Sequence, residues 1–368
     1  MKNPAAERLD YIDCLRGVAI GGVVLVHAGQ LIGNLPGWLR SAAGYGGHGV
    51  ALFFILSALT LVSVYTGRQT AWRSFWLRRW FRLAPMFYLG ILAYLCLRGA
   101  GPSVNAPDGI GARQIVLTLL FLHGWMFDSI NSVVPGGWSI GNEAMFYLLF
   151  PLLLRFLNTG RRTAIMLIAA AAVSRLSYMM IPHWFAGMTT PELLNIFAAF
   201  CFLTQFPAFI CGFAAYFIIQ RLDDSPALRN KFLTHGAFAL AAALLIGLAA
   251  SNQKSLANYL LADFVLIPLV VAVRFSQTPL IVNAVLRHIG KVSYSIYIIH
   301  FAVIDWARIH GLPGLADFDP GAQLAIVYVS VLAVATALAT LTYRWIELPM
   351  IELGRKTAVR FESENNSR

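Results

Sequence analysis

Ten apolar segments, each close to the length that crosses a lipid bilayer, recur along this chain of 368 residues. A membrane-spanning α-helix needs about 20 mostly apolar residues, and a helix satisfies its own backbone hydrogen bonds within lipid. The sequence therefore predicts an all-α fold, a polytopic membrane helix bundle of about ten transmembrane helices. The predicted spans are 12–33, 46–66, 83–99, 139–157, 163–181, 196–219, 233–251, 257–273, 292–310 and 321–343.

Composition and charge agree with a membrane protein. Hydrophobic residues make up 58% of the chain and charged residues 12%, which is too apolar for a soluble domain of this length. The net charge of +11 comes from Lys and Arg in short loops that alternate with loops poor in both. We interpret this pattern as the positive-inside signal, with both termini cytoplasmic and no role in nucleic-acid binding. It requires that the short apolar run at 114–125 forms a re-entrant or interfacial helix.

The predicted organisation is a single membrane domain over residues 1–353, followed by a polar, mobile cytoplasmic tail over 354–368. The four cysteines lack the spacing of metal ligands, so neither a zinc site nor a disulfide framework is expected. No metal is predicted.

Arg16 and His27 lie eleven residues apart inside the first predicted span. Eleven residues make three helical turns, so both side chains project from one face, about 16 Å apart along the axis. Ionisable groups within a membrane are costly and usually functional. A neutral imidazole could accept the proton of a hydroxyl nucleophile. The alternative is a histidine that hydrogen-bonds between helices.

Further polar groups occur beside or within the other spans. Arg78, Arg79 and Arg82 precede the third span and suit a phosphate, although ordinary positive-inside anchoring is the alternative. Trp138, Ser139 and Glu143 open the fourth span, where the carboxylate could orient a histidine or bind sugar hydroxyls; helix capping by Ser139 is the competing account. The later spans add polar residues that together indicate one interior polar chamber: Ser293, Tyr294, Tyr297, His300 and Glu347.

In this order the motifs resemble the acyltransferase-3 family of integral membrane proteins, which O-acylate bacterial surface polysaccharides, peptidoglycan, lipid-linked sugars and some antibiotics. The resemblance covers Leu9 to Pro349. One departure is Ala58 after Ser57, where the family usually has Ser-Gly. The matching positions are the Arg-x10-His element at Arg16 and His27, the glycine-rich motif at 46–61, the arginine segment with Pro85, the Trp-Ser and Glu, the Ser-Tyr to His element, and the Glu-x-Pro at Glu347 and Pro349.

The resemblance implies transfer of an acyl group, acetyl foremost, from acyl-CoA to a sugar hydroxyl of a polysaccharide or lipid-linked glycan at the bacterial inner membrane. It implies catalytic roles for His27, Arg16 and Glu143, with His27 as general base or acyl relay. It implies donor binding by Arg78, Arg79 and Arg82, and substrate binding by Trp138, Ser139, Ser293, Tyr294 and His300. Some relatives add an extracytoplasmic hydrolase-like domain, which we do not expect here, so this chain is expected to complete the transfer alone.

Two other classes of function fit the same polar residues. A proton-coupled transporter or exporter of a glycan or small molecule would also bury Arg, His and Glu. Against it, no inverted repeat and no matched pair of broken helices is evident in the sequence. A scaffold or receptor that retains the bundle without chemistry is the third possibility. Consumption of acyl-CoA distinguishes the enzyme from both.

Overall fold

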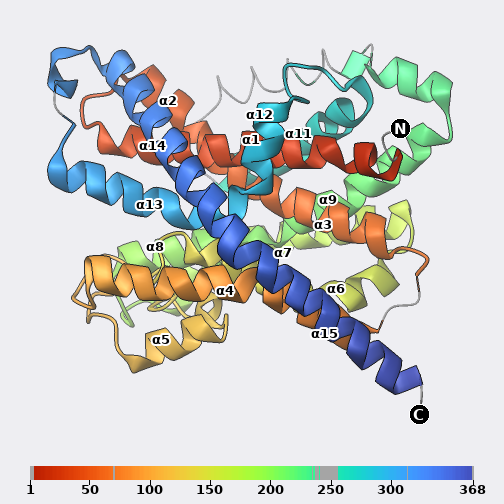
Figure 1. Cartoon of the computed structure of the whole chain (residues 1–368), viewed down its shortest axis with the longest axis horizontal. Helices are drawn as coiled ribbons and strands as arrows, with labels where there is room; N and C mark the ends of the chain where they lie inside the picture. Colours follow the sequence, from red (N-terminus) through yellow and green to blue (C-terminus); the bar gives the residue numbers. More distant parts are fainter. Residues whose placement is uncertain are drawn as a thin grey trace. The chain divides into compact units, whose positions relative to one another are not determined.

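The computed structural model describes residues 4–68, 71–233, 235–236, 240, 256–312 and 314–366. Within those ranges the named elements are all helices, and no strand occurs (Figure 1). The principal helices are α1 Pro4–Leu31, α2 Gly37–Gly44, α3 Gly49–Tyr65, α4 Trp72–Arg98, α5 Ala112–Leu119, α6 Gly137–Phe156, α7 Gly160–Trp184, α8 Pro191–Phe200, α9 Phe202–Asp223, α11 Leu256–Ser276, α12 Ala284–Lys291, α13 Ser293–His310, α14 Pro320–Thr342 and α15 Leu348–Asn366.

Each predicted span within the described ranges coincides with a helix, and 196–219 coincides with two, α8 and α9, separated at Cys201. The predicted span 233–251 lies largely outside the described residues. Six helical stretches of the described chain are long and apolar enough to cross a membrane: Asp10–Leu31, Gly37–Tyr65, Trp72–Arg98, Gly160–Trp184, Pro191–Asp223 and Pro320–Glu362. The all-α polytopic membrane fold is thus confirmed, while the count of ten crossings stays a prediction.

Two segments outside the predicted spans, 114–125 and the C-terminal segment, form helices of their own. The apolar run at 114–125 forms the eight-residue α5 and the short 3-10 helix η2, His123–Trp125. Eight residues rise only about 12 Å, which is too short to cross the hydrocarbon core.

The segment predicted as a polar, mobile tail is instead helical as far as Asn366, because α15 packs on α4 and buries Ala358 completely.

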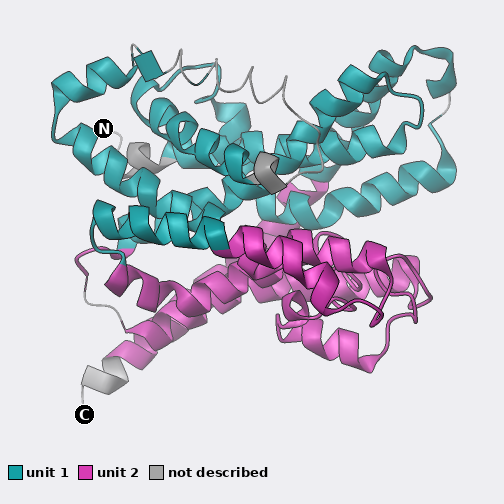
Figure 2. Cartoon of the chain, turned by 180° about the vertical axis from the view of Figure 1, so that it is seen from behind, with its two compact units in different colours: residues 1–64, 157–172, 206–336 teal, residues 65–156, 173–205, 337–368 magenta. Residues whose placement is uncertain are grey.

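The chain divides into two compact units (Figure 2). Unit 1 comprises residues 1–64, 157–172 and 206–336, and unit 2 comprises residues 65–156, 173–205 and 337–368.

In unit 1, glycines allow the backbones of α1 and α12 to pack directly against each other. A Cβ atom on Gly290 of α12 would collide with the carbonyl of Asp13 on α1. A Cβ atom on Gly17 would collide in turn with the carbonyl of Leu286. Small residues at such crossings allow the close packing typical of membrane helices. Asp10 and Arg287 add an ion pair of 2.7 Å between the same two helices, which fixes the orientation of α1.

In unit 2, an aromatic core holds α4 against α6. The Phe75 and Phe150 rings stack with centroids 5.4 Å apart, and both side chains are fully buried. Between α14 and α15 the chain makes a π-helical turn, η4 Tyr343–Glu347, and buries Glu347 to 1% exposure. Such π-turns are rare and occur often at functional sites. The core therefore positions α4 and α6, which carry several of the predicted site residues, and η4 presents a carboxylate within the same unit.

Candidate functional site

The site in unit 1 is built around two histidines. His27 lies one turn before the end of α1, and its ring centroid is 5.4 Å from that of His300 on α13. Phe301 packs against both rings, at 4.4 Å from His27 and 4.2 Å from His300. His300 is completely buried and His27 is half-buried. We call these two residues the histidine pair.

Hydrogen bonds orient both rings of the histidine pair in the same way. The Nδ1 atom of His27 is 2.9 Å from Oε1 of Gln30, and Nδ1 of His300 is 3.1 Å from the carbonyl oxygen of Ile296. The backbone carbonyl of Ile296 only accepts, so Nδ1 of His300 carries the proton and its Nε2 has the free lone pair in the neutral ring. With Oε1 of Gln30 as the partner, His27 takes the same tautomer. Nε2 of His300 is buried without a hydrogen-bond partner among the described residues. The pair thus presents a basic nitrogen of the kind that accepts a proton from a hydroxyl.

Arg16 is held apart from the histidine pair. Its guanidinium donates to Oδ1 of Asp13 at 3.1 Å and to Oγ1 of Thr60 on α3 at 3.3 Å. Because Arg16 and His27 share α1, about 16 Å of helix separates them. The structure therefore places both residues in one unit but gives Arg16 its own partners, of which Asp13 was not among the predicted site residues.

The other predicted residues of α13 begin that helix and lie farther from the histidine pair. Ser293 and Tyr294 precede His300 by seven and six residues, about 10 Å along the helix axis. Tyr297 lies one turn from His300, with ring centroids 5.8 Å apart. The ring of Tyr297 therefore lies beside the pair, and substrate contacts by Ser293 and Tyr294 stay predictions.

Unit 2 holds a second group of polar side chains, which we call the arginine–glutamate cluster: Arg79, Arg82, Glu143, Tyr147 and Glu347. Tyr147 donates a short hydrogen bond to Glu143 one turn earlier on α6. The guanidinium of Arg79 lies over the Tyr147 ring at 5.7 Å. Arg82 interacts electrostatically with Glu347 and Glu143. The cluster therefore combines two cations, two carboxylates and one phenol.

The three predicted donor-binding arginines differ in how they are engaged. Arg78 forms an ion pair of 3.4 Å with Glu362 on α15. Arg79 leaves its Nε atom buried without a hydrogen-bond partner among the described residues, and Arg82 interacts electrostatically with Glu347 and Glu143. A bound phosphate accepts hydrogen bonds from guanidinium groups, so Arg79, whose Nε has no hydrogen-bond partner among the described residues, fits that role better than Arg78, which is paired with Glu362.

Trp138 and Ser139 take part in the packing of unit 2. Trp138 is buried and stacks on Phe200 of α8, with centroids 4.4 Å apart and planes inclined by 14°. Ser139 is buried and its hydroxyl donates to the carbonyl oxygen of Gly136 at 3.1 Å. These contacts give both residues a structural role at the start of α6, and their predicted substrate contacts remain predictions.

Sequence reasoning missed a second fully buried histidine besides His300, namely His123 in η2. Its Nε2 lies 2.9 Å from the carbonyl oxygen of Gly137, and its ring stacks on Phe87. Burial lowers the pKa of His123 to about 4, so its ring is neutral near pH 7. A lone histidine in a short apolar run gives no sequence signal for this contact. The described residues contain no group of three or more His, Cys, Asp or Glu side chains that could hold a metal ion.

Comparison with known proteins finds relatives that are named O-acetyltransferases. O-acetyltransferase OatA of Staphylococcus aureus strain NCTC 8325 is 23% identical over 95% of this chain and 58% of its own length. A second protein, of strain COL, provisionally named as O-acetyltransferase SACOL0978, is 24% identical over 95% of this chain and 59% of its own. This chain thus spans less than two thirds of these relatives.

No solved structure matches the chain. The model of the acyltransferase-3 family, described as an acyltransferase domain, matches residues 9–344, which include the histidine pair and every member of the arginine–glutamate cluster except Glu347. The chain therefore belongs to the acyltransferase-3 family.

Proposed function

We propose that this protein is an O-acyltransferase that moves an acyl group, acetyl foremost, from acyl-CoA to a sugar hydroxyl of a polysaccharide or lipid-linked glycan. The observation that carries the proposal is the orientation of His27, whose Nδ1 is engaged by Gln30 so that Nε2 is the basic atom. Family membership and the O-acetyltransferase names of the relatives support the reaction class.

In the proposed step, Nε2 of His27 takes the proton of the acceptor hydroxyl while the oxygen attacks the thioester carbonyl carbon. The carbon–sulfur bond breaks, and the CoA thiolate takes the proton from His27, which leaves an ester and free CoA. The same Nε2 could instead attack the thioester first and form an acyl-histidine that the sugar hydroxyl then opens. Both routes need His27, and both convert the thioester and the hydroxyl into an ester and free CoA.

We assign the remaining roles to the arginines according to the side chains that each one contacts. Arg79 and Arg82 would hold the phosphates of the donor, because Nε of Arg79 has no hydrogen-bond partner among the described residues and Arg82 follows it by three residues on the same helix. Arg16 is fixed by Asp13 about three helical turns from His27. It is too far along α1 to act on the oxygen that His27 activates, so we assign it to binding the donor. Glu143 would orient bound substrate through its contact with Tyr147.

The test measures CoA release by the purified protein with acetyl-CoA and a panel of undecaprenyl-linked and free glycans, with mass spectrometry of the products. Wild type should release CoA and acetylate an acceptor, and His27→Ala should do neither. His310→Ala is the matched control, since His310 is an exposed histidine of α13 outside the pair. Intact thioester with wild type, together with glycan transport that is lost in His27→Ala, would replace the enzyme by the exporter. Label retained on His27 without acceptor would select the acyl-histidine route.

A further inference from the structure

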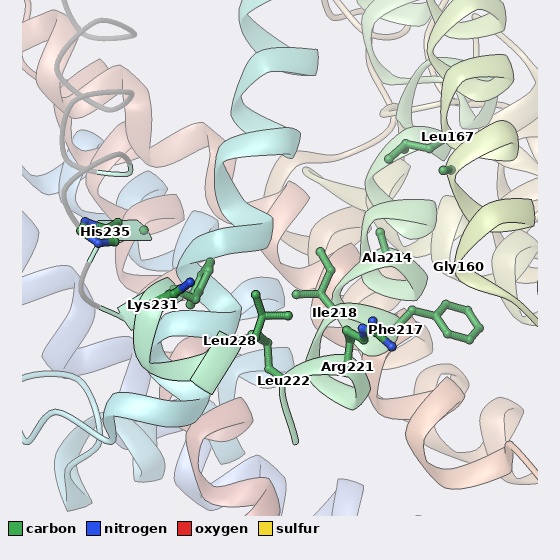
Figure 3. Close-up of a pocket in the computed structure, with 13 residues that line it drawn as sticks. Gly160, Leu167, Ala214, Phe217, Ile218, Arg221, Leu222, Leu228, Lys231 and His235 are labelled. Atoms are coloured by element: carbon green, nitrogen blue, oxygen red, sulfur yellow. The ribbon is translucent and has the colours of Figure 1, made fainter. Parts of the chain in front are cut away.

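A groove of about 900 Å³ lies in unit 1, on helices that carry neither member of the histidine pair (Figure 3). It is bounded by the start of α7, the second half of α9 and the helical segment that follows α9. Small residues Gly160, Ala164 and Ala214 hollow it, and Phe217 and Ile218 form part of its apolar wall. Its volume falls within the range of ligand pockets in proteins.

Basic side chains line the same groove. Arg221 comes from the last turn of α9, and Lys231 and His235 come from the segment after it. Arg221 and Lys231 are exposed, so their charges are available to a ligand at the surface. Asp223 and Asp224 follow Arg221 in the sequence but do not line the groove. Among the described residues, the lining therefore carries basic groups and no carboxylate.

The position of the groove relative to the bilayer indicates which class of ligand it can bind. Gly160–Trp184 and Pro191–Asp223, which contain α7 and α9, are both long and apolar enough to span a membrane. Gly160 begins α7 and Arg221 lies near the end of α9, so the basic residues gather where two spans meet one membrane surface. Apolar walls below a basic rim at that depth match a lipid, with acyl chain in the groove and phosphate at the rim.

We propose that this groove is a binding site for an anionic phospholipid of the bilayer. The phosphate is held by Arg221 and Lys231, and one acyl chain lies along Ala164, Ala214 and Ile218. Because the proposal uses no residue of the histidine pair or the arginine–glutamate cluster, it stands or falls independently of acyl transfer. By the positive-inside rule, the leaflet concerned is the cytoplasmic one.

The experiment uses the full chain, purified in detergent, with native mass spectrometry to count bound lipid during titration with phosphatidylglycerol or phosphatidylcholine. Wild type should retain phosphatidylglycerol preferentially. Each cation near a lipid phosphate contributes about 1 kcal/mol, so Arg221→Gln with Lys231→Gln should weaken phosphatidylglycerol binding roughly 25-fold. The matched control is Arg161→Gln with Arg162→Gln, which removes two exposed cations at the start of α7 that do not line the groove.

A second variant, Ala214→Phe, tests the acyl-chain half of the site. It should reduce retention of both lipids because the new ring fills the groove. Equal retention of the two lipids by wild type would overturn the proposal, as would equal losses in the two glutamine double variants. Displacement of phosphatidylglycerol by an equimolar polyprenyl phosphate would overturn the assignment to a bilayer phospholipid. Unchanged thermal unfolding of the glutamine variants distinguishes lost binding from lost structure.

Discussion

The histidine pair and the arginine–glutamate cluster bury polar groups in opposite ways. His27 and His300 contact each other and Phe301, and their hydrogen bonds go to uncharged carbonyl oxygens. Arg79 and Arg82 instead lie among carboxylates and aromatic rings of unit 2. The first arrangement needs no charge in its resting state, whereas the second places cations and anions in the same cluster.

This difference assigns different chemistry to the two units. A neutral imidazole with a free Nε2 can take and return a proton at a reacting hydroxyl. Burying cations beside carboxylates is costly in free energy. The guanidinium groups can nevertheless donate charge-assisted hydrogen bonds to a bound anion such as a phosphate. We therefore expect changes in unit 1 to affect turnover and changes in unit 2 to affect the affinity for acyl-CoA.

The largest expected effect is that of His27→Ala. Removing a general base typically costs 10²- to 10⁴-fold in rate, so kcat should fall about 10³-fold while the KM for acetyl-CoA stays within about two-fold. Steady-state kinetics of CoA release in matched detergent micelles measure both constants. A rise in KM at unchanged kcat would contradict the division between the two units, because His27 would then act in binding.

In unit 2, Arg79→Ala should raise the KM for acetyl-CoA with little change in kcat. A hydrogen bond to a charged group contributes about 1.5–3 kcal/mol, which predicts a rise of roughly 10- to 100-fold. Arg78→Ala is the control, because Arg78 is already paired with Glu362 and should change KM by no more than about three-fold. Equal effects of the two variants in the same kinetic assay would show that the unsatisfied Nε of Arg79 does not distinguish a donor-binding arginine from Arg78.

The sequence predicted the helices because twenty apolar residues specify a membrane helix almost independently of tertiary contacts. The same criterion failed at the chain's end, where residues 354–366 are polar on average but form α15. Gly354 packs on Phe81 and Ser74 donates to the carbonyl of Ala358, contacts with α4 that no local pattern reveals. Tertiary packing, not hydropathy, determines this helix.

For the site, sequence predicted which residues are polar within the spans but not how they are partnered. Arg16 and His27 are visible because an ionisable group in an apolar run is conspicuous. Asp13 and Gln30 are one turn from them, and nothing in the sequence marks either as their partner. The contact of His27 with His300 joins α1 to α13 and requires the fold.

Among the smaller effects, His300→Phe should lower kcat/KM for the acceptor roughly 10-fold, because the buried imidazole lies against the ring of His27 and its loss removes a polar group beside the base. Phenylalanine keeps the ring contact with Phe301 but removes the buried Nε2 lone pair. His310→Phe, an exposed position on the same helix, should leave kcat/KM unchanged. If kcat/KM for the acceptor were the same in His300→Phe and wild type, the second histidine would be a packing residue only.

The smallest predicted effect belongs to Gln30, which we treat as a positioning residue for His27. Gln30→Met keeps the length of the side chain but removes the oxygen that accepts from Nδ1, so kcat should fall about five-fold, the value of roughly 1 kcal/mol. Gln30→Glu retains an acceptor of the same reach and should keep most of the activity. Gln30 is exposed, so neither change should alter the thermal unfolding temperature. If Gln30→Met and Gln30→Glu lowered kcat equally, the Nδ1 hydrogen bond would not set the orientation of His27. The assignment of Nε2 of His27 as the basic atom would then lose its support.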